Sequence, residues 1–343
     1  NKDAIGNKYG NDYIELDYSN KEKILALSKK INIDYICAPA HDLGLLTATY
    51  VANRLSLPGY DNINTSKKIV YKDEFKKFSN QIKFKTVKEY SNYFSFNDLP
   101  VLNIKNKFIL KPIDSGGGRG ISLISNNKEL LSAKQKALNA SKSKKFIIED
   151  YIEGSLHSLN TYIFNNTIIF YYHDDEFCLN NQFGVSTSSS PSTLKKTNLK
   201  SALLDLEYFS KMLNLKNGIL HSQILQNNTG YYFVELTRRC SGDLYSLPVK
   251  FSTNIDLADV FIRNYIDKTI NKDYFLNSKK QTSFISRHCL MAHKNGKIDY
   301  VFISPKIKDN VIYELSFAKK GSLITNWKFE KFGVFVLKFK SET

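Results

Sequence analysis

The chain has 343 residues, more than a single hydrophobic core usually serves, so we expect two or three packed subdomains. Hydrophobic residues make up 42% of the sequence and occur throughout it, which excludes a disordered chain. No apolar run approaches the about 20 residues that span a bilayer, and no signal segment opens the sequence. We therefore expect a cytoplasmic protein that does not contact membranes.

The net charge of +16 is carried mainly by lysine, and lysine is scattered along the chain. Nucleic-acid surfaces favour arginine, and the sequence has only six: Arg54, Arg119, Arg238, Arg239, Arg263 and Arg287. We expect a solvated lysine-rich surface and no nucleic-acid partner. Nucleic-acid binding through lysine stays an alternative that predicts steeply salt-sensitive binding to any duplex. The four cysteines (Cys37, Cys178, Cys240 and Cys289) have no metal or redox spacing and are expected to be reduced thiols.

The first third of the chain alternates predicted strands and helices. Strands are expected at 13–16 and 34–38, and helices at 21–30 and 45–55, the second helix ending before Pro58-Gly59. This order predicts a parallel sheet with crossover helices. Because a first strand and helix would normally precede residue 13, we interpret residues 1–68 as an α/β domain that is incomplete at its N-terminus.

The pattern then changes twice. Residues 69–150 predict a charged helix, a strand at 108–110, a glycine-rich loop, a helix and a strand at 146–148. Residues 151–270 predict strands around 161–172, a serine-rich loop at 180–193, helices near 200–213 and 256–267, and a hairpin of strands 219–225 and 231–236. Residues 271–343 predict short strands in a small closing lobe.

Three segments carry residues suited to chemistry. The first is Lys111-Pro-Ile-Asp-Ser-Gly-Gly-Gly-Arg-Gly120, directly after an apolar strand. Such glycines let backbone N–H groups point at phosphate oxygens, and the lysine supplies a cation within reach of them. The segment is neither a Walker A sequence nor a Rossmann fingerprint, and a glycine turn without a ligand is the alternative.

The second segment, 146–154, is an apolar strand that runs into acidic residues and a glycine. Carboxylates and backbone amides at a strand end can bind an adenine amino group and a ribose hydroxyl, although a solvent-facing strand exit explains the pattern equally well. His157 follows, and a lone histidine is more often structural.

The third segment is the predicted hairpin. The tight turn places Gln223 near Glu235, and strand alternation places Glu235, Thr237 and Arg239 on one face. The side-chain oxygen atoms of Gln223, Glu235 and Thr237 suit Mg²⁺, and Arg239 suits a phosphate or a carboxylate. A polar surface-facing strand is the alternative, since apolar Val234 and Leu236 occupy the other face.

Taken together, the three segments resemble the ATP-grasp superfamily over nearly the whole chain. The resemblance implies an ATP-grasp fold of the α/β class, with a partial Rossmann-like domain at 1–68, a linker helix and lid at 69–150, a metal-binding subdomain at 151–270 and a small C-terminal lobe at 271–343. It implies ATP-binding roles for ten residues: Lys68, Lys111, Ser115, Gly116, Gly117, Gly118, Glu149, Asp150, Ile152 and His157.

The resemblance also implies Mg²⁺, or Mn²⁺, on Gln223, Glu235 and Thr237, and catalytic roles for Arg239 and Lys111. The implied activity is an ATP-dependent carboxylate–amine ligase that forms an acyl phosphate, acts on small molecules and is optionally a homodimer. Thr237 stands where the family usually has Asn, and Gln223 where many ligases have Glu. Losing the carboxylate charge weakens magnesium binding, whereas Thr237 still offers one oxygen. An ATP-binding protein of the same fold with weakened catalysis, and a carbamoyl-phosphate-synthetase-like activation of a carboxylate, stay open as alternatives. A biotin carboxylase is disfavoured, because the chain lacks the length and the Met-Lys-Met target.

Overall fold

The computed structural model describes residues 5–38, 40–90, 106–266, 268, 270–278 and 283–340. Its helices are α1 (Lys21–Lys30), α2 (Asp42–Leu55), α3 (Ile63–Val70), α4 (Lys72–Gln81), α5 (Asn127–Ala140), α6 (Lys196–Leu213), α7 (Ser246–Thr253), α8 (Leu257–Tyr265) and α9 (Pro305–Lys308), with 3₁₀ turns η1 (Ile5–Lys8) and η2 (Lys272–Phe275). Its strands are β1 (Phe108–Pro112), β2 (Ser122–Ile124), β3 (Phe146–Asp150), β4 (Ser155–Phe164), β5 (Thr167–Cys178), β6 (Val185–Ser190), β7 (Gly218–Asn227), β8 (Gly230–Thr237), β9 (Phe284–Leu290), β10 (Gly296–Lys297), β11 (Val311–Ser316), β12 (Leu323–Ile324) and β13 (Gly333–Phe339).

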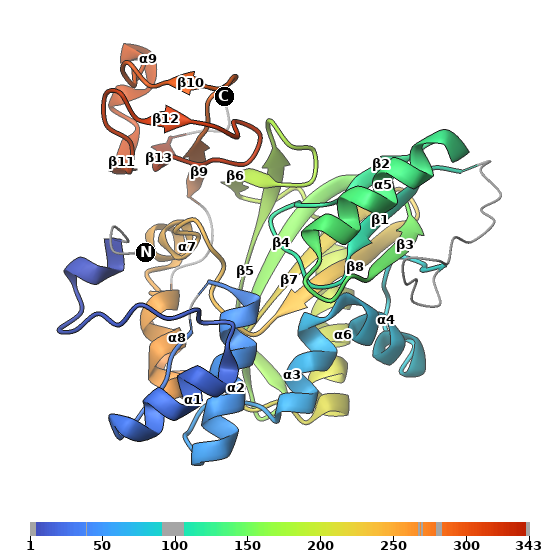
Figure 1. Cartoon of the computed structure of the whole chain (residues 1–343), viewed down its shortest axis with the longest axis vertical. Helices are drawn as coiled ribbons and strands as arrows, with labels where there is room; N and C mark the ends of the chain where they lie inside the picture. The colour runs from blue at the N-terminus through green and yellow to red at the C-terminus, as the bar shows by residue number, and fades with distance from the viewer. Residues whose placement is uncertain are drawn as a thin grey trace.

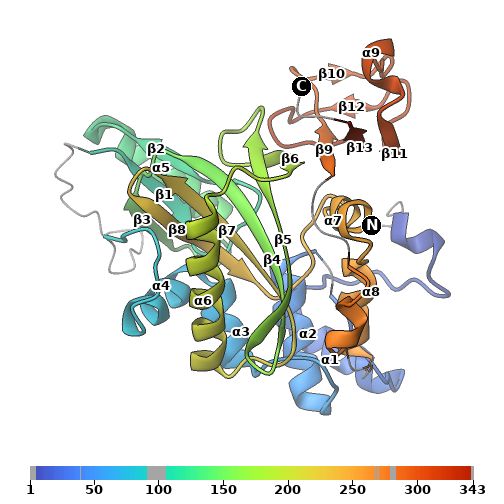
Figure 2. The ribbon, with the colours of Figure 1, turned by 180° about the vertical axis from the view of Figure 1, so that it is seen from behind.

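An eight-stranded sheet with the order β11-β13-β9-β6-β5-β4-β7-β8 runs through the molecule, and each of its ladders is antiparallel (Figure 1). Successive side chains of a strand point to opposite faces, so the sheet builds two cores. Ile219 of β7 joins a core with α2, α7 and α8, whereas the next residue, Leu220, joins a core with α4 and α6. Figure 2 shows α6 lying along the second face.

A separate three-stranded sheet, ordered β2-β1-β3, is covered by α5. Leu110, Phe146 and Ile148 pack against Ala137 of α5 in a third core of their own. The glycine-rich segment connects β1 to β2 at the end of this sheet. The strand–glycine loop–helix–strand order expected for 108–150 is therefore confirmed, and it forms a small unit beside the large sheet (Figure 1).

The parallel sheet expected in the first third of the chain is wrong for the residues described there. No strand forms at 13–16 or at 34–38. Ile14 is 52% exposed and Tyr35 is 49% exposed, so neither segment is buried as a sheet strand would be. A strand needs a neighbouring strand for its backbone groups, and neither segment belongs to a sheet among the described residues. The expected helices α1 and α2 do form.

The small C-terminal lobe predicted at 271–343 shares the large sheet with the rest of the chain. Strands β9, β11 and β13 continue the large sheet through the β6–β9 ladder, in which Thr187 pairs with His288. The predicted boundary at residue 270 thus divides one sheet into two parts. The predicted loop at 180–193 is partly strand, since β6 occupies Val185–Ser190.

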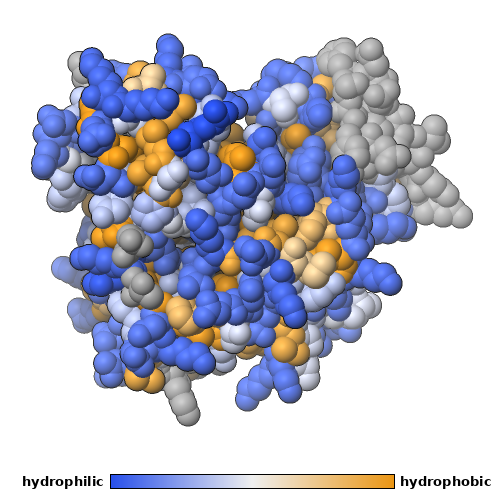
Figure 3. Space-filling view, turned by 90° about the horizontal axis from the view of Figure 1, so that it is seen from below, coloured by the Kyte–Doolittle hydropathy of each residue, from blue (hydrophilic) through white to orange (hydrophobic). Residues whose placement is uncertain are grey.

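The surface agrees with the scattered distribution of charge in the sequence. On the face seen in Figure 3, hydrophilic residues cover most of the area and hydrophobic ones form separate patches. Among the helices that the structure describes, none is long and apolar enough to cross a membrane.

Candidate nucleotide and metal site

The hairpin of β7 and β8 forms as the sequence predicts. Gln223 lies directly opposite Glu235 in the antiparallel ladder. A register shift follows this pair, so that Ile224 faces Phe233 and strand alternation is broken. Leu236 and Phe233 consequently belong to the same core although they are three residues apart. The shift leaves Glu235 half-buried beside Gln223.

Glu176 of β5 supports this pair, and the sequence analysis missed it. The side-chain amide of Gln223 donates a hydrogen bond of 2.6 Å to Oε2 of Glu176. This bond uses the amide nitrogen, so the amide oxygen of Gln223 is left to accept a ligand. Burial, together with the neighbouring Asp174, raises the pKa of Glu176 to about 8. The signal was the acidic run 174–176 after a predicted strand.

Asp42, at the first turn of α2, reaches the end of β8. Its carboxylate accepts two hydrogen bonds from the Arg239 guanidinium, at 2.7 and 2.9 Å, and one of 3.0 Å from the Thr237 hydroxyl. Burial favours a higher pKa for Asp42, but hydrogen bonds and charge from Arg239 outweigh it and lower the pKa. Thr237 and Arg239 are thus brought together as predicted, and Asp42 connects them to the N-terminal part of the chain.

Lys68 of α3 and Lys72 of α4 lie in different surroundings. Lys68 places Nζ 5.0 Å from the ring centre of Phe78, in a cation–π contact. Lys72, the first residue of α4, instead donates a hydrogen bond of 2.9 Å to the carbonyl oxygen of Ser115 in the glycine-rich segment. Lys72 is among the residues that line the pocket described below, and Lys68 is not. Sequence reasoning missed the break at Tyr71, which separates α3 from α4.

A small pocket of about 20 Å³ gathers these groups. Its polar lining consists of Asp42, Lys72, Glu235, Thr237 and Arg239. Two cations, two carboxylates and a hydroxyl therefore converge from α2, α4 and β8. A space of this size is comparable to that of one water molecule.

The glycine-rich segment lies over this pocket. A side-chain carbon at Gly116 would lie 3.9 Å from Oδ2 of Asp42, and one at Gly117 would meet nothing within 4 Å. Gly117 and Gly118 have φ of +66° and +73°, the left-handed region that favours glycine. Gly118 also approaches the segment before β6 so closely that an added carbon would lie 2.6 Å from the carbonyl oxygen of Phe183. The loop leaves room for a ligand at Gly116 and Gly117 and packs tightly at Gly118.

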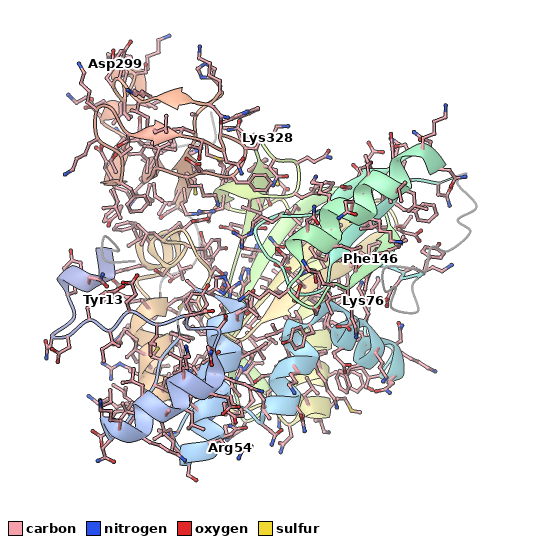
Figure 4. All side chains as sticks on the ribbon, viewed as in Figure 1. Tyr13, Arg54, Lys76, Phe146, Asp299 and Lys328 are labelled. Carbon is pink, nitrogen blue, oxygen red and sulfur yellow. The ribbon has the colours of Figure 1, made fainter. Side chains whose placement is uncertain are left out.

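Glu149 of β3 is enclosed by two lysines. Its carboxylate forms ion pairs with Nζ of Lys111 of β1, at 2.6 Å, and with Nζ of Lys76 of α4, at 2.9 Å, and all three side chains are at most 5% exposed. Lys76, labelled in Figure 4, also donates 2.7 Å to the carbonyl oxygen of Val87. Burial lowers the pKa of Lys76 in spite of Glu149, while the two lysines lower the pKa of Glu149 against the effect of burial. The cluster holds one more cation than anion, which suits a nearby anionic ligand.

The other residues expected near the nucleotide lie in different surroundings. Asp150 ends β3 and Ile152 follows it, half-buried, at the strand exit. His157 is fully buried in β4, with Nδ1 2.6 Å from Asp175 Oδ1 and Nε2 2.7 Å from Ser155 Oγ. Both ring nitrogens are engaged within the protein, so the structural interpretation of His157 fits better than a ligand contact.

The donor atoms at this site are of the chemical type that binds a magnesium–nucleotide ligand. The Glu235 carboxylate, the Gln223 amide oxygen and the Thr237 hydroxyl are hard oxygen donors of the type that Mg²⁺ takes together with phosphates. Within the part of the chain that the structure describes, no group of three His, Cys, Asp or Glu side chains is arranged to hold a metal ion. A metal here would depend on the amide, the hydroxyl and phosphate oxygens beside a single carboxylate.

Comparison with known proteins identifies this arrangement. The sequence model of the ATP-grasp domain matches residues 104–246, which include Lys111, the glycine-rich segment and the β7–β8 hairpin. The chain contains an ATP-grasp domain, and the resemblance inferred from its three segments is confirmed. No curated protein matches the chain in sequence.

Solved structures agree on the fold. The L-amino acid ligase of Bacillus licheniformis superposes with a TM-score of 0.77 at 16% identity, over 95% of this chain and 80% of the other. Phosphoribosylglycinamide synthetase of Anaerococcus prevotii superposes with a TM-score of 0.73 at 17% identity, over 98% of this chain and 85% of the other. The biotin carboxylase domain of 2-oxoglutarate carboxylase from Hydrogenobacter thermophilus superposes with a TM-score of 0.72 at 16% identity, over 95% of this chain and 76% of the other. At these identities the similarity establishes the ATP-grasp fold.

Proposed function

We propose that the chain is an ATP-dependent carboxylate–amine ligase that forms an acyl phosphate and releases ADP and phosphate. The observation that carries the proposal is the convergence of Lys72, Arg239 and Glu235 on one small pocket beneath the glycine-rich segment. A cation for phosphate, an arginine for a carboxylate and a carboxylate for a metal are the groups that such a reaction needs. The similarity to an L-amino acid ligase and a phosphoribosylglycinamide synthetase supports the same reaction class.

In this proposal Lys72, Lys111 and the backbone amides of 115–118 hold the phosphates. Glu235, with the oxygen atoms of Gln223 and Thr237, would hold Mg²⁺ or Mn²⁺, which supplies neutralisation of phosphate charge. Glu149, Asp150 and Ile152 form the adenine side. Arg239 balances the charge of the transferred group, and its ion pair with Asp42 sets its orientation.

The reaction proceeds in two transfers. A carboxylate oxygen of the first substrate attacks the γ-phosphorus, the bond from that phosphorus to the ADP oxygen breaks, and an acyl phosphate forms. The nitrogen of a neutral amine then attacks the acyl carbon, the carbon–oxygen bond to phosphate breaks, and the amide nitrogen releases a proton to solvent. Phosphoryl transfer of this kind depends mainly on positioning and charge stabilisation, which the lysines and Arg239 supply.

A second candidate is an ATP-binding protein of the same fold with weakened catalysis. Gln223 and Thr237 are neutral where the family pattern favours a carboxylate and an amide, so Glu235 is the one carboxylate among the three proposed metal ligands. Glu176 favours the first candidate, because its hydrogen bond leaves the oxygen of Gln223 available to a cation. The two candidates differ in turnover rather than in ATP affinity.

The test measures ADP release with Mg-ATP against amino acids and small carboxylates, alone and in pairs, for the wild type and Glu235→Ala. Turnover that requires an acid and an amine, and that is lost in Glu235→Ala, is the expected result. ATP binding without turnover for any pair would favour the second candidate. Absence of ATP binding would contradict both. A cytoplasmic location and a homodimer stay predictions of the sequence.

A further inference from the structure

A second cavity lies close to the small polar pocket, since residues adjacent in sequence line the two spaces. It has a volume of about 540 Å³, within the range of about 300–1,000 Å³ typical of small-molecule sites. It is formed by the segment before α2, the loop after β8 and one face of α8. Figures 1 and 2 both show α7 and α8 beside the N-terminal segment.

Two chain segments connect the cavity to the proposed reaction site. Asp42 lines the small pocket and Ala40 lines the cavity; Arg239 lines the small pocket and Cys240 lines the cavity. The Arg239 guanidinium donates a hydrogen bond of 3.0 Å to the carbonyl oxygen of Cys240, so residues that line the two spaces are in direct contact. The cavity is therefore adjacent to the arginine of the proposed reaction site.

The lining is predominantly apolar. Leu244, Ala258, Phe261 and Ile262 contribute hydrocarbon surface, and Cys37 and Cys240 contribute thiols. Burial raises the pKa of Cys37 to about 11 and that of Cys240 to about 12, so both thiols are neutral at pH 7. Neutral thiols behave as small apolar groups. The cavity therefore suits a hydrocarbon group rather than a charged one.

A few polar groups at the cavity limit the chemistry of the rest of the ligand. The Ser241 hydroxyl is buried and has no hydrogen-bond partner among the described residues, although buried hydroxyls normally have one. The Asp243 carboxylate is paired with Lys331 and lies 3.9 Å from Arg287. Because these cations neutralise Asp243, it does not offer a free anion to a substrate ammonium. The groups at this cavity thus favour the acid over the amine.

The loop that forms the cavity has an unusual backbone. Asp243 and Leu244 both have positive φ, of 56° and 54°, although neither is glycine. Left-handed conformations in bulky residues are costly and concentrate at functional sites. Two in succession after Arg239 hold Leu244 against the cavity.

We propose that this cavity binds the apolar body of the carboxylate substrate, with Ser241 hydrogen-bonding a polar atom near its carboxylate. The substrate class is an acid that carries a branched or aromatic hydrocarbon group. The inference rests on the proposed ligase function, which places the carboxylate of the acid at Arg239. A cavity of this volume accommodates such a group.

The test compares isosteric acids and a variant that fills the cavity. 4-Methylpentanoate and succinamate have the same shape and differ in polarity, as do leucine and asparagine. Gly242 lines the cavity, does not have a positive φ, and has nothing within 4 Å of an added side-chain carbon, so Gly242→Leu places a side chain in open space. Gly6→Leu adds the same side chain in open space outside the cavity and is the matched control.

We expect the apolar acid of each pair to support ADP release with KM at least tenfold lower than its polar partner. One mismatched group in an apolar pocket is worth about 10–200-fold. Gly242→Leu should raise that KM at least tenfold and leave the KM for ATP unchanged, whereas Gly6→Leu should change neither. If Gly242→Leu does not fold, Ile262→Asn tests the same lining from a half-exposed position, with exposed Leu276→Asn as its control.

Equal or better use of the polar isosteres, or an unchanged KM in Gly242→Leu and Ile262→Asn, would overturn the inference while the ligase function stands. If no acid supports ADP release, equilibrium binding of 4-methylpentanoate to the ATP-loaded protein tests the cavity assignment separately from the ligase function. Binding that Gly242→Leu weakens tenfold keeps the cavity assignment and removes the ligase function. No binding removes both.

Discussion

Lys72 and Lys68 are four residues apart but differ in what they contact. Lys72 lies at the glycine-rich segment, whereas Lys68 covers the ring of Phe78. Lys72→Met should lower kcat/KM for ATP on the order of 100-fold, because it removes a preorganised cation from the phosphates. Lys68→Met, measured in the same ADP-release assay, should change it less than threefold. Equal losses in the two variants would show that the phosphate cation is misassigned.

Glu149 forms ion pairs with two buried lysines at once. Glu149→Gln leaves Lys76 and Lys111 without their anion and should lower the free energy of unfolding by about 3–5 kcal/mol. Exposed Glu153→Gln on the same strand exit should change it by less than about 0.5 kcal/mol. Urea unfolding at pH 7 without nucleotide measures both. A Glu149→Gln protein as stable as the wild type would mean that this ion cluster is not buried.

At the scale of elements, the glycine-rich loop between β1 and β2 provides a matched pair. Gly117 and Gly118 both have positive φ, so alanine costs each about 1–2 kcal/mol in backbone conformation. Only Gly118 meets a neighbour, the Phe183 carbonyl oxygen at 2.6 Å. Gly118→Ala should therefore lower kcat/KM and the melting temperature clearly more than Gly117→Ala does. The reverse order would indicate that the loop does not pack on the segment before β6.

The elements that the sequence predicted correctly carry local signals. The β7–β8 hairpin follows from its Asn-Asn-Thr-Gly turn, which brings Gln223 near Glu235. The register shift between Gln223 and Ile224, which places Gln223 directly opposite Glu235, has no such local signal. The strand–glycine loop–helix–strand order of 108–150 follows from periodicity and composition. The errors involve contacts between distant residues. Residues 34–38 have the composition of a strand, but no strand of the described residues lies beside them. Asp42 reaches Arg239 across 197 positions, which periodicity cannot indicate.

At the scale of the whole molecule, buried acids link stability to pH. Burial raises the pKa of Glu176 to about 8 from an ordinary value of 4.5, so the folded state binds a proton there that the unfolded state has released. The free energy of unfolding contributed by Glu176 is therefore present below pH 4.5 and lost as pH rises through 8. Each pH unit in this window is worth up to about 1.4 kcal/mol.

Glu176→Gln isolates this effect, because the other titrating groups are shared with the wild type. In metal-free buffer the stability of the wild type relative to Glu176→Gln should fall steadily from pH 5 to pH 8. Chemical unfolding at several pH values gives the difference directly. A constant difference across this range would show that Glu176 titrates normally and is exposed to solvent.

The account as a whole depends on transfer of phosphate to a carboxylate in the pocket of Lys72, Glu235 and Arg239. The most direct measurement uses a mixture of acids labelled with ¹⁸O in the carboxylate, with amines and Mg-ATP, and determines the mass of the released phosphate. An acyl phosphate predicts one ¹⁸O atom in that phosphate for the wild type, and loss of labelled phosphate in Glu235→Ala. Phosphate released without ¹⁸O would contradict the acyl-phosphate ligase proposed for this chain.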